Sequence, residues 1–183
     1  GVLSHLSPEL RLTLKDLISL MIMISDNTAT NMVIRNVGMD TVNQLAADLN
    51  CGQTVLVRMM MDHEAVKRGK DNMTSASDIV RFLKEIVEGS ILNEENKKAV
   101  YDTLLNQQFH TKLPALITGG FSLHATLAHK TGELPGTEHD AGIFCFNGKY
   151  AYVAVLTTEL SDNASGQRVI AQVGKLVFHY LRA

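Results

Sequence analysis

Residues 139–157 read HDAGIFCFNGKYAYVAVLT, two runs of strand-forming residues joined by Asn147-Gly148. Asn-Gly between two such runs is the strongest short-range signal of a β-hairpin, because both residues tolerate the left-handed backbone of a two-residue turn. The pattern predicts strands over 139–146 and 149–157. Residues 126–131 form a third candidate strand, so we expect a three-stranded antiparallel sheet in the second half of the chain.

A helix is expected after this sheet, and an unusually apolar helix is expected near the start of the chain. Thr13 and Asp16 have the spacing of a capping box, and they open a predicted helix over 14–24. Because that stretch is apolar nearly all round, we expect it to be buried. The last helix is predicted over 165–181, with an expected core face made of Val169, Ile170, Val173, Leu176, Val177 and Tyr180.

Four more helices are predicted between these two from their cap and stop signals. They are a helix over 28–36 that stops at Gly38, one capped by Asp40 that ends near Asn50, one capped by Thr74 or Ser75 that stops at Gly89, and one that Asn93 caps. Residues 53–72 lack periodicity, and a connection of that length is usually functional or poorly ordered. The sequence thus predicts an α+β fold in one domain over 1–183, with a helical lobe over 10–110 and a lobe of sheet and C-terminal helix over 111–183.

The composition is that of a globular protein, and it argues against several functional classes. The chain of 183 residues is 45% hydrophobic and 20% charged, and its formal net charge of −2 argues against nucleic-acid binding. Its two cysteines lack Cys-x-x-Cys spacing and its seven histidines are scattered, so we expect no metal and no cofactor. No apolar run approaches the ~20 residues that cross a bilayer, so we expect no membrane segment in this chain.

Two polar tripeptides are the candidates for chemistry. Ser25-Asp26-Asn27 lies between two predicted helices, and Lys130-Thr131-Gly132 lies at the end of the first predicted strand. Alone, the first is an ordinary turn and helix cap, and the second is an ordinary strand end with an exposed lysine. Together they suit a cleft that binds a carboxylate while a substrate runs along a strand edge. Ser161-Asp162-Asn163 repeats the first tripeptide without a second Lys-Thr-Gly, so we interpret it as a turn and helix cap.

The pair of tripeptides resembles the class A β-lactamases and related penicillin-recognising serine enzymes, whose motifs are Ser-x-x-Lys, Ser-Asp-Asn and Lys-Thr-Gly. The resemblance covers essentially the whole chain, including the helix start at residues 74–78 and the stretch 129–136. It is closest to the broad bacterial serine hydrolase branch, rather than to the clinical resistance enzymes. It implies a β-lactamase/transpeptidase-like fold, truncated at the N-terminus, and a small-molecule β-lactam, peptide or ester as substrate.

The resemblance also assigns a role to each residue of the first tripeptide that would touch substrate. Ser25 would relay a proton to the leaving nitrogen and help to hold the substrate carboxylate. Asn27 would hydrogen-bond the substrate side-chain amide and the catalytic lysine.

The second tripeptide would supply electrostatic and backbone groups. Lys130 would provide positive potential and a hydrogen bond to Ser25, and Thr131 would bind the carboxylate. The strand just after Gly132, at Glu133, would provide one oxyanion-hole N–H. His129, beside Lys130, is interpreted as a strand histidine packed against a neighbour.

The nucleophile motif of the family is missing from this chain. None of its lysines has a serine three positions before it, so no Ser-x-x-Lys occurs. In the family that motif lies N-terminal to the point where this chain begins, so we expect a partial chain that is inactive by itself. Without that segment we also expect unburied apolar surface and self-association.

The second departure concerns the glutamate that activates the deacylating water in class A enzymes. Arg58 matches the arginine that anchors the corresponding loop, but a methionine of the run 59–61 occupies the position of the glutamate. Asp62 and Glu64 are candidate substitutes for that glutamate, but both are in the wrong register. The favoured interpretation of each is a solvated loop carboxylate.

Two functions stay open. The first is part of a serine β-lactamase-like hydrolase that acts through an acyl-enzyme on β-lactams or related amides and esters. The second is a non-catalytic binding module, or a penicillin-binding or esterase-like protein with no efficient β-lactam turnover. The binding module predicts reversible, salt-sensitive ligand binding that is lost in Lys130→Ala.

Overall fold

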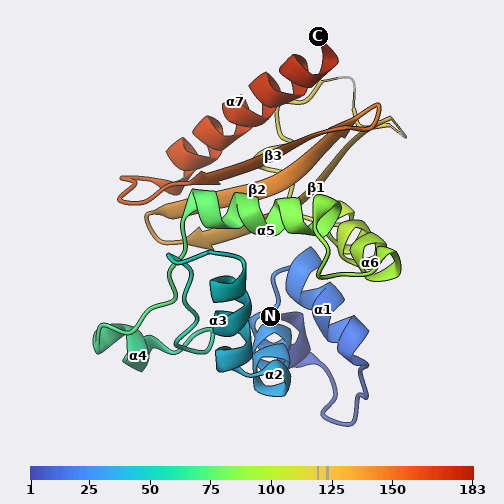
Figure 1. Ribbon diagram of the computed structural model, residues 1–183. Coiled ribbons are helices and arrows are strands. Elements are labelled where there is room, and N and C mark those ends of the chain that lie inside the picture. The colour runs from blue at the N-terminus through green and yellow to red at the C-terminus, as the bar shows by residue number, and fades with distance from the viewer. Residues whose placement is uncertain (119, 123) are drawn as a thin grey trace. The chain divides into compact units, whose positions relative to one another are not determined.

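The computed structural model describes residues 1–118, 120–122 and 124–183, which form two compact units, 1–78 and 79–183. The boundary falls inside the fifth helix, so the sixth helix groups with the sheet. The elements in chain order are η1 (Val2–His5), α1 (Leu14–Met23), α2 (Asn27–Val37), α3 (Met39–Asp48), α4 (His63–Lys67), α5 (Ala76–Glu88), α6 (Glu94–Leu105), β1 (Ala125–Leu134), β2 (Thr137–Phe146), β3 (Lys149–Leu156) and α7 (Asn163–Arg182) (Figure 1). The α+β fold predicted from the sequence is confirmed.

The caps of α1, α5 and α6 follow the local signals closely. The capping box of α1 is confirmed, because Thr13 Oγ1 accepts from the Asp16 N–H at 3.2 Å and Asp16 Oδ2 accepts from the Thr13 N–H at 2.8 Å. Ser75 caps α5, since its Oγ accepts from the Asp78 N–H at 3.2 Å. Asn93 likewise caps α6 through the Asn96 N–H at 2.8 Å. Caps depend on neighbours in sequence, so they are predictable from it.

Two expectations for the first unit are wrong. Asp40 does not cap α3, because α3 starts at Met39 and Asp40 lies in its first turn. The helix α2 runs on to Val37, and Gly38, with a φ of 86°, separates the two helices. The helix α1 is not buried. All of its residues are described, and of these Leu17 alone is buried, while Leu14 is exposed. Within the unit α1 packs against α2, which covers one side of it.

The second unit is built on an antiparallel sheet of order β1-β2-β3. The hairpin predicted at Asn147-Gly148 is confirmed, with φ of 49° and 78° and with Phe146 opposite Lys149. The strand β1 runs to Leu134, beyond the predicted end at 131. It does so because Pro135-Gly136 forms a second two-residue turn that places Leu134 opposite Thr137 and keeps the strands paired up to it.

The core of this unit lies between one face of the sheet and α7 (Figure 1). It consists of Leu113, Ala125, Leu127, Phe144, Ile170 and Phe178. The helix α6 packs against β1 and α7 against β2. In the part of the chain that the structure describes, no helix is both long and apolar enough to span a bilayer.

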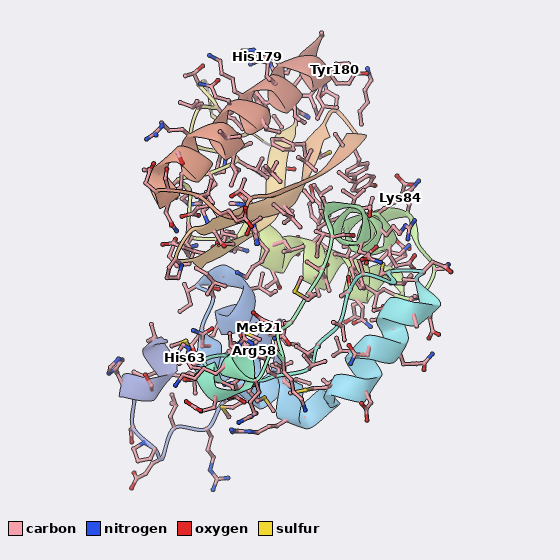
Figure 2. The ribbon with its side chains drawn as sticks, turned by 90° about the vertical axis from the view of Figure 1, so that its left-hand side faces the viewer. Met21, Arg58, His63, Lys84, His179 and Tyr180 are labelled. Carbon is pink, nitrogen blue, oxygen red and sulfur yellow. The ribbon has the colours of Figure 1, made fainter. Side chains whose placement is uncertain are left out.

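The predicted core face of α7 is partly wrong. Ile170 is buried, but Val169, Leu176 and Tyr180 are exposed, and Figure 2 shows Tyr180 projecting from the end of the helix. The buried stripe contains Gly166 and Gly174 instead. A Cβ at Gly166 would lie 2.9 Å from Cβ of Glu138, so these glycines let the helix approach the sheet closely. A helix face predicted from its apolar side chains alone leaves these glycines out.

Candidate active site

Ser25 ends the first helix of the candidate site in a left-handed conformation. Its φ is 55°, which is uncommon for a residue with a side chain. The next N–H, that of Asp26, donates back to the carbonyl of Leu20 at 3.1 Å, so the chain leaves α1 through a left-handed C-terminal cap. The turn leaves Ser25 exposed on the surface of its unit.

Asp26 fixes the start of the following helix. Its carboxylate is fully buried and accepts from the N–H groups of Ala29 at 2.9 Å and Leu3 at 3.0 Å. Burial by itself raises the pKa of this carboxyl, but the hydrogen bonds from the Ala29 and Leu3 N–H groups outweigh it and hold the pKa below its ordinary value. Asp26 is thus a structural anchor that orients its two neighbours, Ser25 and the half-buried Asn27.

Lys130 lies on β1 in the other unit, and its Nζ donates to the carbonyl of Thr131 at 2.6 Å. Burial lowers its pKa to about 8; the carboxylate of Asp140 opposes that effect and the cation of Lys112 adds to it. The ammonium is therefore still mostly charged at neutral pH, but it titrates far below an ordinary lysine.

The backbone of Glu133 faces the outer edge of β1. In an antiparallel strand the N–H and C=O of one residue point to the same side, and the side alternates along the chain. Glu138 accepts from the Thr157 N–H at 3.0 Å, so its backbone faces the β3 side. Glu133 pairs with Glu138 across β1 and β2, so the Glu133 N–H points away from β2.

The six residues predicted for the site thus fall into two groups. Ser25 and Asn27 flank a buried anchor in the first unit. The other four are consecutive on β1, where Thr131 is buried opposite Asp140 and Glu133 is exposed. Gly132 lies opposite His139, and a Cβ there would lie 3.3 Å from that of His139, which is a tight contact.

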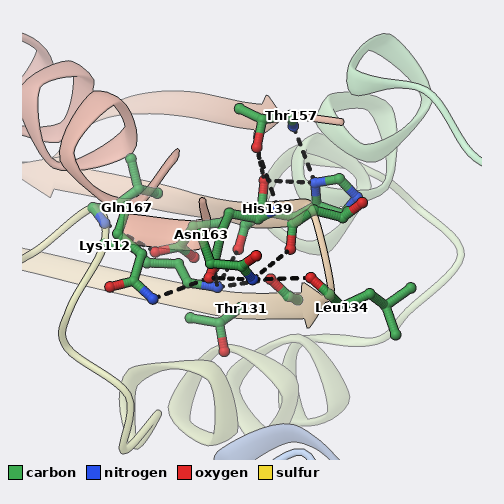
Figure 3. A network of polar contacts seen from close by, with 12 residues as sticks. Lys112, Thr131, Leu134, His139, Thr157, Asn163 and Gln167 are labelled. Atoms are coloured by element: carbon green, nitrogen blue, oxygen red, sulfur yellow. Dashed lines mark hydrogen bonds and ion pairs between the residues drawn. The ribbon is translucent and has the colours of Figure 1, made fainter. Parts of the chain in front are cut away.

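Sequence reasoning missed the buried charges behind β1. Lys112 and Glu138 form an ion pair whose side chains are 2% and 0% exposed. Gln167 Nε2 and Asn163 Nδ2 each donate to Glu138 Oε1 at 3.0 Å (Figure 3). Glu138 and Asp140 are two positions apart, on a strand face that should be apolar. Two carboxylates on such a face are the sequence signal that could have indicated buried, paired charges.

His129 is packed as predicted for an ordinary strand histidine. Its side chain is buried, and Nδ1 lies 2.9 Å from Oδ1 of Asp140. Asp140 Oδ2 accepts from the Leu113 N–H at 3.0 Å, so the carboxylate ties β1 to the segment before it.

The second Ser-Asp-Asn tripeptide is a turn and helix cap, as predicted. Asp162 Oδ1 accepts from the Ser165 N–H at 2.8 Å and caps α7. Asn163 accepts from the Gly136 N–H and donates to the carbonyl of Leu134, both at 2.9 Å, and so holds the β1–β2 turn.

The connection that carries the methionines is pinned at several points. Asn31 holds Met60, accepting from its N–H at 2.7 Å and donating to its carbonyl at 3.1 Å. Arg58 Nε donates to Asp71 at 2.7 Å, and Asn72 Oδ1 accepts from the Arg58 N–H at 3.0 Å. Figure 2 labels Arg58 on this connection.

The two loop carboxylates, Asp62 and Glu64, each have a partner within their own segment. Asp62 caps α4 by accepting from the Ala65 N–H at 2.9 Å, and Glu64 pairs with Lys67 at the surface at 2.7 Å. Over the described ranges, no group of three or more His, Cys, Asp and Glu side chains is placed to hold a metal ion.

A protein-family model described as the β-lactamase enzyme family matches residues 1–181. Among solved structures, a β-lactamase from Sphaerobacter thermophilus is 32% identical with a TM-score of 0.91, and the match covers 99% of this chain and 68% of that one. PBP-A is 30% identical with a TM-score of 0.83, covering 100% and 66%. An acyl-enzyme complex of a PBP-A mutant with penicillin G is 29% identical with a TM-score of 0.84 and the same coverage. The chain thus spans about two thirds of the length of these relatives.

Proposed function

The chain belongs to the β-lactamase enzyme family, and on this basis we propose that it is part of a serine hydrolase that acts through an acyl-enzyme on β-lactams or related amides and esters. Residues 1–183 would act as one functional domain, with both groups of site residues serving one acyl-transfer reaction. The observation that carries the proposal is the edge of β1. There Lys130, whose pKa is lowered by burial, lies three positions before Glu133, whose N–H points away from β2.

Five of the six site residues have a proposed role in this reaction. The exposed Ser25, held by the buried Asp26, relays a proton to the leaving nitrogen, and Asn27 binds the substrate amide. Lys130 supplies positive potential and Thr131 a hydroxyl for the substrate carboxylate. The Glu133 N–H stabilises the oxyanion that forms during acyl transfer.

The nucleophile of this reaction lies outside the 183 residues. The chain contains no Ser-x-x-Lys, and it spans about two thirds of the length of its solved relatives. We refer below to the polypeptide that includes the Ser-x-x-Lys segment as the complete protein.

The second tripeptide provides a matched control for testing the role of Ser25. In the complete protein, Ser25→Ala should slow acylation by a fluorescent penicillin about 100-fold, because a positioned proton-transfer group contributes about 10²–10⁴. Ser161→Ala removes the same group from the same tripeptide at the helix cap and should leave the rate unchanged. Equal rates in Ser25→Ala and the unmodified protein would refute the assignment.

One observation favours slow deacylation, as in a penicillin-binding protein, over efficient β-lactam turnover. Met60 is half-buried and its backbone is held on both sides by Asn31, while Asp62 and Glu64 are used elsewhere. PBP-A, one of the similar proteins, forms an acyl-enzyme with penicillin G in a mutant form.

The acyl-enzyme should persist in the complete protein, and Met60→Glu should shorten its lifetime. Rapid release without any substitution would exclude this second function.

A further inference from the structure

Lys112 is a buried cation that the proposed reaction does not yet use. Its Nζ donates to the carbonyl of Gly132 at 2.7 Å and to that of His139 at 3.3 Å, and these two residues face each other across β1 and β2. The ion pair with Glu138, which Asn163 and Gln167 also hold, fixes the ammonium over this pair of carbonyls (Figure 3).

The carbonyl that Lys112 contacts belongs to the same peptide group as the Glu133 N–H. In a trans peptide the C=O and the N–H point in opposite directions. The Gly132 carbonyl is directed toward Lys112, so the Glu133 N–H is directed to the free side of β1, in agreement with the strand register. Because the peptide group is planar, the orientation of the Gly132 C=O fixes that of the Glu133 N–H.

A cation on the carbonyl also changes the strength of the N–H as a donor. It draws electron density toward the carbonyl oxygen, and hydrogen bonds in such a chain strengthen one another. The effect is larger where water is excluded, and Lys112 is 2% exposed.

We propose that Lys112 is a positioning residue for the oxyanion hole, orienting and polarising the Gly132–Glu133 peptide so that the Glu133 N–H stabilises the developing oxyanion. This role rests on the proposed function, because it presumes that an oxyanion forms at Glu133. Lys112 itself does not touch the substrate. The role is separate from that of Lys130, which in the proposed reaction supplies positive potential to the substrate.

The test uses the pair Lys112→Met with Glu138→Gln, since Lys112→Met alone leaves a buried, unpaired carboxylate and endangers folding. In the complete protein the double variant should acylate about tenfold more slowly, less than the ~100-fold that loss of a whole oxyanion donor costs. The non-covalent dissociation constant for penicillin should change less than twofold. Lys149→Met, at an exposed position, should leave both values unchanged. Acylation of the double variant at the unmodified rate would overturn the proposal.

A spectroscopic measurement on the 183-residue chain separates this inference from the proposed function. Loss of the Lys112 bond should shift the ¹⁵N resonance of the Glu133 amide upfield in the double variant, while Glu138→Gln alone, which keeps that bond, should shift it much less. If the complete protein fails to acylate, the proposed function fails and this shift still decides the role of Lys112. An unchanged Glu133 resonance, or an equal shift in Glu138→Gln, would contradict it.

Discussion

At the residue scale, Lys130 owes its chemistry to opposing surroundings. Burial and the nearby cation of Lys112 lower its pKa, and Asp140 limits the fall to about 8. Asp140 in turn is held by His129 and the Leu113 N–H. The charge on the lysine thus depends on residues from three separate segments. Sequence motifs identify Lys130, but its pKa depends on contacts that they do not encode.

The affinity for carboxylate ligands should depend on pH through Lys130. The ammonium is charged below about pH 8 and neutral above it, so the affinity for penicillin should be constant up to pH 7 and fall about tenfold by pH 9. Calorimetric titration of the 183-residue chain measures this without interference from a covalent step. Lys130→Ala should abolish binding at every pH and Lys149→Ala should not. A flat profile up to pH 10 would contradict the role of Lys130.

Glu138 should make the free energy of unfolding depend on acid. Burial raises its pKa, but the hydrogen bonds from Lys112, Gln167 and Asn163 outweigh burial and hold it below the ordinary 4.5. A lowered pKa gives stability that is present above 4.5 and is lost as the pH falls through the folded-state value.

Replacing Glu138 with Gln should therefore destabilise the protein by about 3 kcal/mol at pH 7 and by clearly less at pH 3. Urea unfolding at the two pH values measures both differences. The exposed ion pair of Lys67 and Glu64 offers a control, since Glu64→Gln should have little effect at either pH. An equal loss at pH 7 and pH 3 would show that the carboxylate charge is not involved.

At the scale of elements, the helix caps and the hairpin follow from local sequence signals, whereas the buried face of α7 depends on tertiary packing. The capping box at Thr13, the cap at Asn93 and the Asn147-Gly148 hairpin were all predictable, because each depends on residues a few positions apart. The face of α7 was not, since it depends on the glycines that contact the sheet and the segment at Leu113. The Lys112–Glu138 pair joins residues far apart in sequence, which no local pattern relates.

The close approach of α7 should make Gly174 intolerant of a methyl group. A Cβ at this position would overlap the backbone carbonyl of Leu113, which belongs to the core and cannot move like a flexible side chain. Gly174→Ala should therefore destabilise the protein by about 1–3 kcal/mol, although alanine favours helices. Gln172→Ala at an exposed position of the same helix is the control. Greater thermal stability in Gly174→Ala would contradict this packing.

At the scale of the whole molecule, the surface side of α7 carries several strongly exposed apolar side chains. Leu176 and Tyr180 are 68% and 80% exposed, and Val169 lies on the same helix at 54%. Among the described strands, β3 is paired on one side, with β2. Exposed apolar area costs about 25 cal/mol per Å², and an unpaired strand edge is a template for association.

The 183-residue chain should therefore self-associate at micromolar concentration. Light scattering after size exclusion should give a mass above that of the 20.1 kDa monomer. Leu176→Gln should shift the distribution toward the monomer, and Lys175→Gln, which changes a polar neighbour, should not. A stable monomer at all concentrations would contradict this expectation.

The account as a whole holds that the two tripeptides serve an acyl-transfer reaction whose nucleophile lies outside these 183 residues. Labelling with a fluorescent penicillin, followed by peptide mapping of the adduct, tests this most directly. We predict a covalent adduct on the serine of the Ser-x-x-Lys segment in the complete protein and no adduct on the 183-residue chain. An adduct on Ser25, or on any other serine of this chain, would contradict the account.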